Sequence, residues 1–461
     1  MSQYLAPDRW ARSLVQAEPA RRWRLWKTWP LSVRDRHRRE QRSSEGTKLS
    51  ERSLLPSRFD GGIMSLSHRL DLLRAPSFAV AAIAMLLAVT AQAMAASYMT
   101  LLAVERAKMS PFELGLFLTL SGISGIGATS LFARIFDKRP RLWPLALSLA
   151  MGAFGYSLCA IIVNRWTLMI VAFLLLGPAT ASFALIYAVA KGGLDQRGST
   201  LAAQGMAALR MIASLSWVIG PALGAFLIHV WSYAGVYGAA SCCSLAALVA
   251  LFAFRPPMVP SITTNEDVRP VAFRWAIKAA ALALTFFNIA MFMGSTALSI
   301  VVVNDLGASE RDVGLMFSLC AAVEVIVMTL FVVLPAKRAN RSLLVAGFAV
   351  LSLYFLSVAL LPMLQVFYGA QLLRAAGIGV ISIVGMLLLQ ELNPGRAGAA
   401  SALFANTTNA GWLVTGIATG TWAELFGYHS IFGLCAALSV LGGALLVSGS
   451  FFGAETKSSR S

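Results

Sequence analysis

Charged residues are scarce in this chain. Asp, Glu, Lys and Arg make up 13% of its 461 residues, whereas hydrophobic residues make up 57%. An average soluble domain carries about 25% charged residues, so this composition argues against an ordinary soluble protein. The apolar residues stand in long continuous blocks rather than at amphipathic spacing, which is typical of a protein that crosses a membrane many times.

Residues that build reactive or metal sites are also few. The four histidines are scattered, and the five cysteines all fall inside apolar blocks without a CxxC spacing, so the sequence predicts neither a metal site nor a disulfide framework. The phosphate-binding pattern GxxxxGK[ST] is absent, which argues against ATP hydrolysis as an energy source. No nucleophile and base stand in a catalytic pattern. We therefore expect no cofactor, no metal and no enzymatic activity.

The apolar blocks are long enough to cross a membrane. A span needs roughly 20 apolar residues, because the hydrocarbon core is about 30 Å thick and a helix rises about 1.5 Å per residue. Since each span must satisfy its own backbone hydrogen bonds in lipid, we expect an all-α polytopic membrane protein. Windows of this length predict twelve spans, numbered here in chain order: 77–104, 114–133, 142–164, 166–190, 200–227, 232–254, 279–303, 313–336, 342–363, 364–390, 397–423 and 430–453.

The net charge of +17 follows the predicted topology rather than a nucleic-acid-binding pattern. Of the 24 Lys and Arg residues from Met64 onward, 18 lie in loops and ends on the same side as the N-terminus. Four lie in loops on the other side, and two lie within spans. Such an excess marks the cytoplasmic side of a membrane protein. We therefore expect both termini in the cytoplasm, membrane lipid as the surroundings, and no nucleic-acid partner.

The spans divide into two sets of six. Residues 255–275 separate the sets and hold four prolines, so we expect a cytoplasmic linker between an N-terminal half, 64–254, and a C-terminal half, 276–455. Both halves carry a basic loop after their second span, at 134–141 and 336–341. A repeat of this kind is the layout of a secondary transporter with its substrate site between the halves.

The ends of the chain differ from the rest. Residues 1–63 are rich in arginine and contain no apolar stretch, which predicts a basic disordered tail. The sequence from Met64 onward is itself a normal short start before the first span. We therefore favour Met64 as the initiator; an ordinary tail, or a tail that touches anionic lipid, is the alternative. Residues 456–461 are expected to form a short tail.

Three groups of motifs carry a resemblance to a known family. The loop FDKRPR resembles the loop 2–3 signature of the major facilitator superfamily, and this resemblance assigns a gating role to Asp137, Lys138 and Arg141. The stretch SLSWVIGPALG (214–224) is similar to a Gly-Pro motif of exporters. The combination of LRMIASLSWVIGP (209–221), CAAVEVIVM (320–328) and LNPGRAGAASALFAN (392–406) resembles the bacterial sugar efflux transporter family. The resemblance implies twelve helices in two six-helix halves, a bacterial inner-membrane location and export of sugars or small glycosides.

One carboxylate stands in the middle of a predicted span. Glu324 is the only charged residue between Val313 and Ala336, and a charge at this depth is costly, about 2.5–3.5 kcal/mol on insertion scales, unless it is paired or hydrated. Arg210 lies within span five, which the resemblance places opposite span eight. We expect Glu324 and Arg210 to form a pair between the halves that rearranges during transport and carries a proton. A static pair that only satisfies both charges is the alternative.

Polar side chains within other spans are the candidates for sugar binding. Amides suit hydroxyl groups because they both donate and accept hydrogen bonds, and an aromatic ring can cover the apolar face of a sugar. Arg374 could donate to hydroxyls or to an anionic group. Each of these residues could instead serve helix packing. The candidates are Asn288, Gln371, Arg374, Asn406, Asn409 and Trp412.

The sequence thus predicts a monomeric secondary active transporter that exports sugars by alternating access, in antiport with protons. A multidrug efflux facilitator is the first alternative, and it would require a more apolar cavity that accepts lipophilic cations. A membrane sensor or scaffold without transport is the alternative from another class. The charges within the spans argue against a sensor or scaffold.

Overall fold

The computed structural model describes residues 76–195, 199–255, 275–333, 341–393 and 397–458. All of them belong to one unit of the chain, Met64–Ser461. The predicted tail 1–63 lies outside the described residues, as do most of the predicted linker 255–275 and the last three residues of the chain. All the described secondary structure is helical.

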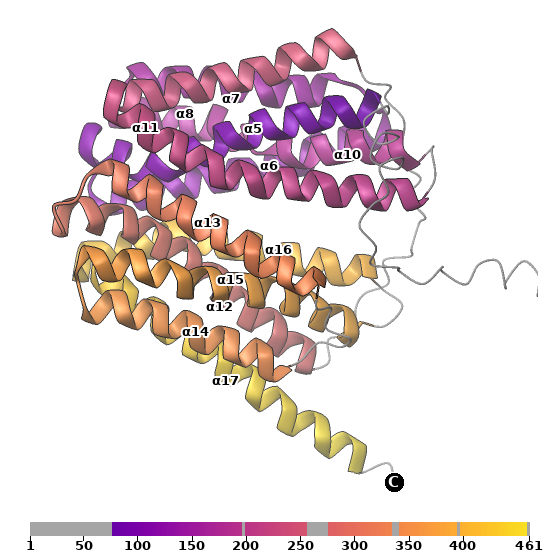
Figure 1. The fold of residues 1–461 in the computed structure, drawn as a ribbon, viewed down its shortest axis with the longest axis vertical. Helices are drawn as coiled ribbons and strands as arrows, with labels where there is room; N and C mark the ends of the chain where they lie inside the picture. Colours follow the sequence, from indigo (N-terminus) through magenta and orange to yellow (C-terminus); the bar gives the residue numbers. More distant parts are fainter. Residues whose placement is uncertain (1–75, 196–198, 256–274, 334–340, 394–396, 459–461) are drawn as a thin grey trace, which may run out of the picture. The chain divides into compact units, whose positions relative to one another are not determined.

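The helices of the N-terminal half follow one another up and down the bundle (Figure 1). The first and fourth predicted spans each contain a π-helical turn, and the fourth span is divided into several short segments. The elements are α5 (Pro76–Leu101), η1 (Leu102–Arg106), α6 (Pro111–Lys138), α7 (Trp143–Ile161), α8 (Arg165–Val171), η2 (Ala172–Leu176), α9 (Gly177–Ala179), α10 (Ala181–Asp195) and α11 (Ser199–Phe254).

The long element α11 contains two helices joined by a kink. Trp231 and Ser232 leave the helical region there, and Ser232 has a φ of 55° and a ψ of −159°. The kink separates the predicted spans 200–227 and 232–254. The chain therefore reverses direction at these two residues, and α11 supplies both the fifth and the sixth predicted spans.

The C-terminal half begins in the same way, because its first helix also ends in a π-helical turn. Its fourth helix, unlike that of the N-terminal half, is continuous. The elements are α12 (Trp275–Ile300), η3 (Val301–Asp305), α13 (Glu310–Val333), α14 (Arg341–Leu360), α15 (Leu364–Leu392), α16 (Ala397–Phe426) and α17 (Ser430–Ser458).

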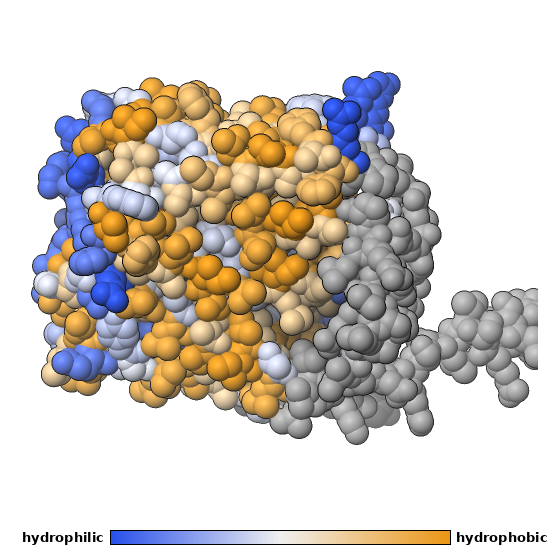
Figure 2. All heavy atoms as spheres, turned by 45° about the horizontal axis from the view of Figure 1, so that its top comes forward, coloured by the Kyte–Doolittle hydropathy of each residue, from blue (hydrophilic) through white to orange (hydrophobic). Residues whose placement is uncertain are grey.

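Ten of the described helical stretches are long and apolar enough to cross a membrane. The stretch Gln204–Phe254 counts once among them although it holds two predicted spans, and α16 is not among them. Asn406, Thr407, Thr408 and Asn409 make α16 more polar than its neighbours. Figure 2 shows one face of the molecule, where a broad hydrophobic surface is bordered along one edge by hydrophilic residues.

The two halves repeat the same turn where their first helix ends. A backbone hydrogen bond of 3.0 Å closes η1 and an equal one closes η3. Two residues after the end of each π-helical turn, Lys108 (φ 52°) and Gly307 (φ 65°) occupy equivalent left-handed positions. Ser110 and Ser309 then stand at the start of the next helix, each followed three residues later by an acidic side chain. This correspondence supports an internal repeat of the two halves.

The helix connections define two ends of the bundle. We call the end with residues 107–110, 162–164, 306–309, 361–363 and 427–429 the outer end, following the predicted topology, and the opposite end the inner end. One hydrophobic core extends over both halves and includes Tyr98 and Phe117 with Met316 and Phe355. A second core lies within the inner part of the N-terminal half. The shared core therefore joins the halves near the outer end.

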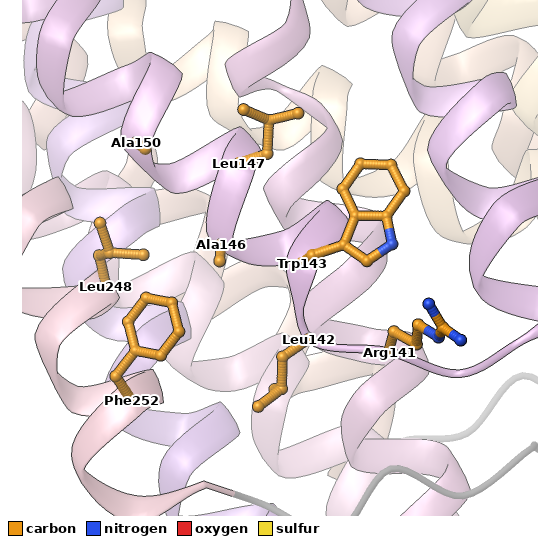
Figure 3. A pocket seen from close by; sticks show the side chains of 8 residues that line it. All are labelled: Arg141, Leu142, Trp143, Ala146, Leu147, Ala150, Leu248 and Phe252. Atoms are coloured by element: carbon orange, nitrogen blue, oxygen red, sulfur yellow. The ribbon is translucent and has the colours of Figure 1, made fainter.

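A groove lies on the surface of the N-terminal half, between α7 and the second helix of α11 (Figure 3). Its volume is about 640 Å³. It is lined by one charged side chain and otherwise by apolar ones: Arg141, Leu142, Trp143, Ala146, Leu147, Ala150, Leu248 and Phe252.

Candidate functional site

Glycines bring α6 and α16 into backbone contact at the outer end. A Cβ atom added at Gly115 would stand 2.6 Å from the Gly416 carbonyl oxygen and 2.9 Å from the Gly420 Cα. A Cβ at Gly420 would stand 2.7 Å from the Pro111 carbonyl oxygen. Since real Cβ contacts are essentially never shorter than 3.0 Å, no other residue fits here without movement. These glycines hold the two halves together at the outer end.

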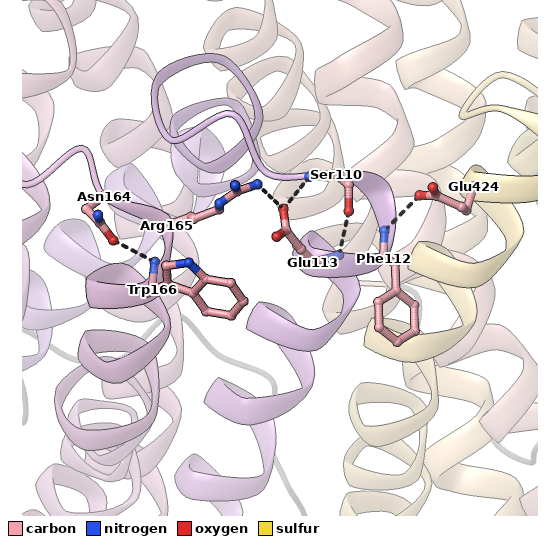
Figure 4. Close-up of polar contacts among 7 residues, drawn as sticks. All are labelled: Ser110, Phe112, Glu113, Asn164, Arg165, Trp166 and Glu424. Atoms are coloured by element: carbon pink, nitrogen blue, oxygen red, sulfur yellow. Dashed lines mark hydrogen bonds and ion pairs between the residues drawn. The ribbon is translucent and has the colours of Figure 1, made fainter.

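Polar groups reinforce this contact (Figure 4). Ser110 and Glu113 form a capping box at the start of α6, which satisfies two backbone N–H groups of the helix end. The Phe112 N–H donates to Glu424 Oε2 of α16 at 3.3 Å. Arg165 approaches Glu113 at 3.1 Å, but this pair is solvent-exposed and contributes little stability.

A second contact between the halves joins α13 to α5 and α11. A Cβ at Gly314 would stand 2.5 Å from the Pro221 carbonyl oxygen and 3.0 Å from the Ala225 Cβ. The same carbonyl oxygen accepts a hydrogen bond from the Tyr98 hydroxyl at 3.4 Å. Pro221 leaves the carbonyl four residues before it without its helical hydrogen bond, and it lies at the contact between α11 and α13.

Several residues toward the inner end of these helices are exposed. On α6, a Cβ at Gly122 or Gly127 would meet no atom within 4 Å. On α11, Arg210 is exposed and Met211 is 73% exposed. On α13, Ile326 is 67% exposed. The tight glycine contacts between the halves therefore lie toward the outer end.

Glu324 lies in the interior of α13, 14 residues after its first residue, which corresponds to about 21 Å along the helix. Its side chain is half-buried. It lies in the electric field of two arginines, Arg210 from the N-terminal half and Arg374 from its own half. Among the described residues, neither arginine has a nitrogen within ion-pair distance of the Glu324 carboxylate. The predicted pair between Glu324 and Arg210 is therefore not in direct contact in this conformation.

Arg210 has an aromatic neighbour on the preceding helix. The Tyr187 hydroxyl of α10 lies near the Arg210 guanidinium and is shielded from solvent. Tyr187 is therefore a neighbour of Arg210 within the N-terminal half.

Arg374 is held inside the C-terminal half. Its side chain is 4% exposed; one guanidinium nitrogen donates to Gln371 Oε1 at 3.3 Å and the other to Ser295 Oγ at 2.5 Å. Its guanidinium carbon lies 5.2 Å from the ring centre of Phe317 and 5.9 Å from that of Tyr354. Two cation–π contacts stabilise a buried arginine. Among the described residues, hydrogen-bond acceptors and aromatic rings, rather than a directly bound carboxylate, thus surround this charge.

The predicted substrate residues fall into two groups. Asn406, Asn409 and Trp412 of α16 are exposed, and the Trp412 ring lies 4.5 Å from the Phe292 ring. By contrast, Asn288 is 7% exposed and donates to its own helix, at the Leu284 carbonyl, over 2.8 Å. Gln371 is fully buried and donates to the Phe367 carbonyl at 3.0 Å. Helix packing accounts for much of the hydrogen bonding of the buried group.

The predicted gating residues lie at the inner end, but only Arg141 stands in the connection between α6 and α7, because Asp137 and Lys138 are the last two residues of α6. Asp137, Lys138 and Arg141 are all exposed, and α6 ends with the hydrogen bond from the Arg139 N–H to the Ile135 carbonyl at 3.1 Å. In the second half, residues 334–340 of the corresponding loop lie outside the described part of the chain.

Several neighbours of the charged residues were not predicted from the sequence. Ser295, Phe317 and Tyr354 surround Arg374, and Tyr187 lies near Arg210. Each comes from a different helix than the arginine that it accompanies. A serine or an aromatic residue within an apolar span has no local feature that distinguishes it from a packing residue.

The family model of the Major Facilitator Superfamily matches residues 25–208 and 279–461. A Deinococcus radiodurans protein provisionally named a sugar efflux transporter is 35% identical over 370 residues, which cover 78% of this chain and 94% of that protein. Sugar efflux transporter A of Dickeya chrysanthemi is 30% identical over 342 residues, covering 73% and 86%.

Solved structures share the fold at low sequence identity. The crystal structure of the nucleoside transporter NupG has a TM-score of 0.67 at 12% identity, covering 81% of this chain and 98% of that chain. The POT family transporter PepTSo has a TM-score of 0.66 at 9% identity, covering 81% and 97%. The chain therefore belongs to the major facilitator superfamily and, within it, to the sugar efflux transporter family. Membership of this family makes it a multi-pass membrane transporter rather than an enzyme.

Proposed function

We propose that the protein exports sugars or small glycosides from the cytoplasm across the bacterial inner membrane, in exchange for protons. The names of its relatives support a sugar as the substrate. The excess of Lys and Arg at the inner end supports an orientation with both termini in the cytoplasm. In this orientation, the tight glycine contacts between the halves lie toward the periplasm, and the sugar is loaded from the cytoplasmic end.

Alternating access provides the mechanism. The halves rock about a site near the midplane, so that the contacts at the outer end part while the inner ends approach. The glycine contacts between α6 and α16 support this motion, because they join the halves through backbone packing. The exposed loop with Asp137, Lys138 and Arg141 is available to hold the inner ends together in the other state.

Glu324 couples the sugar to protons in this proposal. Desolvation raises the pKa of a carboxylate, while a nearby arginine lowers it. When the halves move, the distance from Glu324 to Arg210 changes, whereas Arg374 belongs to the same half as Glu324. The affinity of the carboxylate for a proton therefore changes as the distance to Arg210 changes. The observation that carries this step is a half-buried carboxylate within the field of arginines from both halves, without a direct ion pair.

The exposed group on α16 binds the sugar. Asn406 and Asn409 stand three residues apart and so share one face of the helix. Their amides supply donors and acceptors for hydroxyls, and Trp412, one turn further, supplies an aromatic surface. Arg374, Gln371 and Asn288 have most of their contacts within the C-terminal half. These three residues therefore support the sugar site indirectly. They contact the sugar only if their present hydrogen bonds within the C-terminal half break.

The test uses inverted membrane vesicles that contain the full chain. Uptake of radiolabelled lactose and glucose is measured with and without an imposed pH gradient, against vesicles without the protein. Uptake of either sugar that rises with an acidic vesicle interior is the expected result. Gradient-driven uptake of a lipophilic cation instead of both sugars would establish the multidrug alternative. No uptake of any of them would favour a sensor or scaffold.

A further inference from the structure

The groove on the N-terminal half has two unlike sides. Trp143, Leu147 and Ala150 of α7 form one wall, and Leu248 and Phe252 of α11 form the other. In Figure 3 the Arg141 guanidinium lies beside Trp143, on the far side of the groove from Leu248 and Phe252, and the indole nitrogen faces the side on which Arg141 lies. Two nitrogen donors thus stand at one rim of an otherwise apolar groove.

The depth of the groove matches one leaflet of a membrane. Arg141 precedes the first residue of α7, and Phe252 lies two residues before the last residue of α11, so the groove begins at the inner end. From Trp143 to Ala150 it extends about 10 Å along the helix axis. Since a hydrocarbon core is about 30 Å thick, the groove stays within the half of the bilayer nearest the inner end.

The walls of the groove are exposed apolar side chains. Trp143 is 43% exposed, Leu147 38% and Phe252 50%. Such a surface lies against lipid tails in a membrane protein, and a tryptophan at the boundary lies at the level of the headgroups. A lipid chain that fills the groove therefore contacts more apolar surface than one against a flat helix face.

The charge at the rim selects the headgroup. Arg141 follows Lys138, the last residue of α6, and Arg139, and Asp137 is the acidic residue among them. All four are exposed. A guanidinium binds a phosphate through two parallel hydrogen bonds, and basic pockets between transmembrane helices bind anionic headgroups on the cytoplasmic side. The local excess of positive charge disfavours a cationic occupant and leaves a zwitterionic lipid with less attraction than an anionic one.

We infer that the groove between α7 and α11 is a binding site for an anionic phospholipid of the inner leaflet. The acyl chain lies along Leu147, Ala150 and Leu248, and the headgroup phosphate binds Arg141 with the Trp143 indole N–H close by. The lipid thereby holds the loop that contains the predicted gating residues. This site is separate from the sugar pathway and does not depend on which substrate the protein carries.

The test measures lipid binding by native mass spectrometry on the purified, delipidated full chain. Dioleoyl phosphatidylglycerol and dioleoyl phosphatidylethanolamine are titrated separately, because they share acyl chains and differ in net charge. Phosphatidylglycerol should bind about fivefold more tightly than phosphatidylethanolamine, the ratio expected for one basic contact. Inorganic phosphate added in excess should displace little phosphatidylglycerol, because it cannot fill the groove; full displacement would identify a free-phosphate site instead.

Variants separate the two parts of the site. Arg141→Gln should weaken phosphatidylglycerol about fivefold and phosphatidylethanolamine less, because the ammonium group of phosphatidylethanolamine offsets the charge of its phosphate, while Arg141→Lys should keep the preference. Ala150→Phe fills the groove away from the loop and should weaken both lipids. Arg341→Gln, at the start of α14 in the other half, is the matched control and should change neither. Equal binding of the two lipids by the native chain, or unchanged binding by Arg141→Gln or Ala150→Phe, would overturn the inference.

Discussion

Replacing Gly416 by alanine adds one methyl group at a direct backbone contact between α6 and α16. A Cβ there would stand 2.7 Å from the Thr119 backbone nitrogen and 2.8 Å from the Gly115 carbonyl oxygen. Because both are backbone atoms, a change of side-chain rotamer cannot relieve these contacts. The two helices must instead move apart, which opposes closure of the outer end.

The size of the effect follows from overpacking at a tight contact. Extra atoms in a well-packed site are unfavourable by about 1–3 kcal/mol. If only the state with a closed outer end contains this contact, the whole penalty falls on that state. The equilibrium then shifts about 5-fold to about 150-fold toward the state with an open outer end.

The assay measures the distance between the outer ends of the two helices. Spin labels are attached at Phe112 of α6 and Leu425 of α16, which are 52% and 68% exposed, after the five native cysteines are replaced by serine. Double electron–electron resonance then gives the populations of short and long distances. Gly416→Ala should increase the long-distance population in lipid nanodiscs.

The control is Gly433→Ala on α17, where an added Cβ would meet no atom within 4 Å. This variant should reproduce the native distances. A folded Gly416→Ala protein with the native distance distribution would refute the reasoning, because the outer contact would then exist in both states or in neither. Thermal unfolding of each variant shows whether the protein is folded.

Two further predictions concern stability. Lys108→Gly should stabilise the protein by about 0.5–1 kcal/mol, because Lys108 has a left-handed φ of 52° that glycine adopts without strain. The matched change Gly307→Ala should destabilise the protein by a similar amount. Midpoints of thermal unfolding equal to that of the native chain would contradict both predictions. Ser295→Ala should destabilise by about 1–3 kcal/mol, because it leaves a guanidinium N–H of the buried Arg374 without its acceptor. The control is Ser299→Ala, because the Ser299 hydroxyl donates to a carbonyl of its own helix. An equal effect of the two serine variants on the midpoint of thermal unfolding would show that Arg374 does not depend on Ser295.

Much of the fold could be predicted because membrane helices are long and apolar. The predicted span 313–336 corresponds to α13, which begins three residues earlier at Glu310. The difference has a local cause: Asp312 accepts hydrogen bonds from the Ser309 N–H and hydroxyl, at 3.0 and 2.6 Å, and starts the helix among polar residues. Hydropathy identifies the lipid-embedded part of a helix, whereas capping groups set its ends.

The partners of the charged residues could not be predicted in the same way. Ser295 binds Arg374 although 79 residues separate them, and the contact depends on how α12 packs against α15. Glu324 was expected beside Arg210, yet its position relative to two arginines depends on the conformational state as well as on the fold. Neither the contact of Ser295 with Arg374 nor the position of Glu324 relative to the arginines follows from the spacing of residues along the chain.

Asn288 illustrates a further limit. The sequence marks it as a polar residue within an apolar span, which suits either a substrate ligand or a packing residue. In the structure, a Cβ at Gly411 of α16 would stand 2.5 Å from the Asn288 Cβ, so α12 and α16 are in close contact there. Its amide donates within α12. The composition of the span could not distinguish these roles, because they differ only in what the neighbouring helix contributes.

The central claim is that Glu324 carries the proton that drives sugar export. The most direct measurement compares the native chain with Glu324→Gln in inverted vesicles, with Glu310→Gln on the same helix as control. Lactose or glucose uptake driven by a pH gradient and exchange of labelled for unlabelled sugar without a gradient are both recorded. The account predicts that Glu324→Gln loses driven uptake and keeps exchange, while Glu310→Gln keeps both. Driven uptake that survives in Glu324→Gln would contradict the account and leave this carboxylate a structural role beside the two arginines.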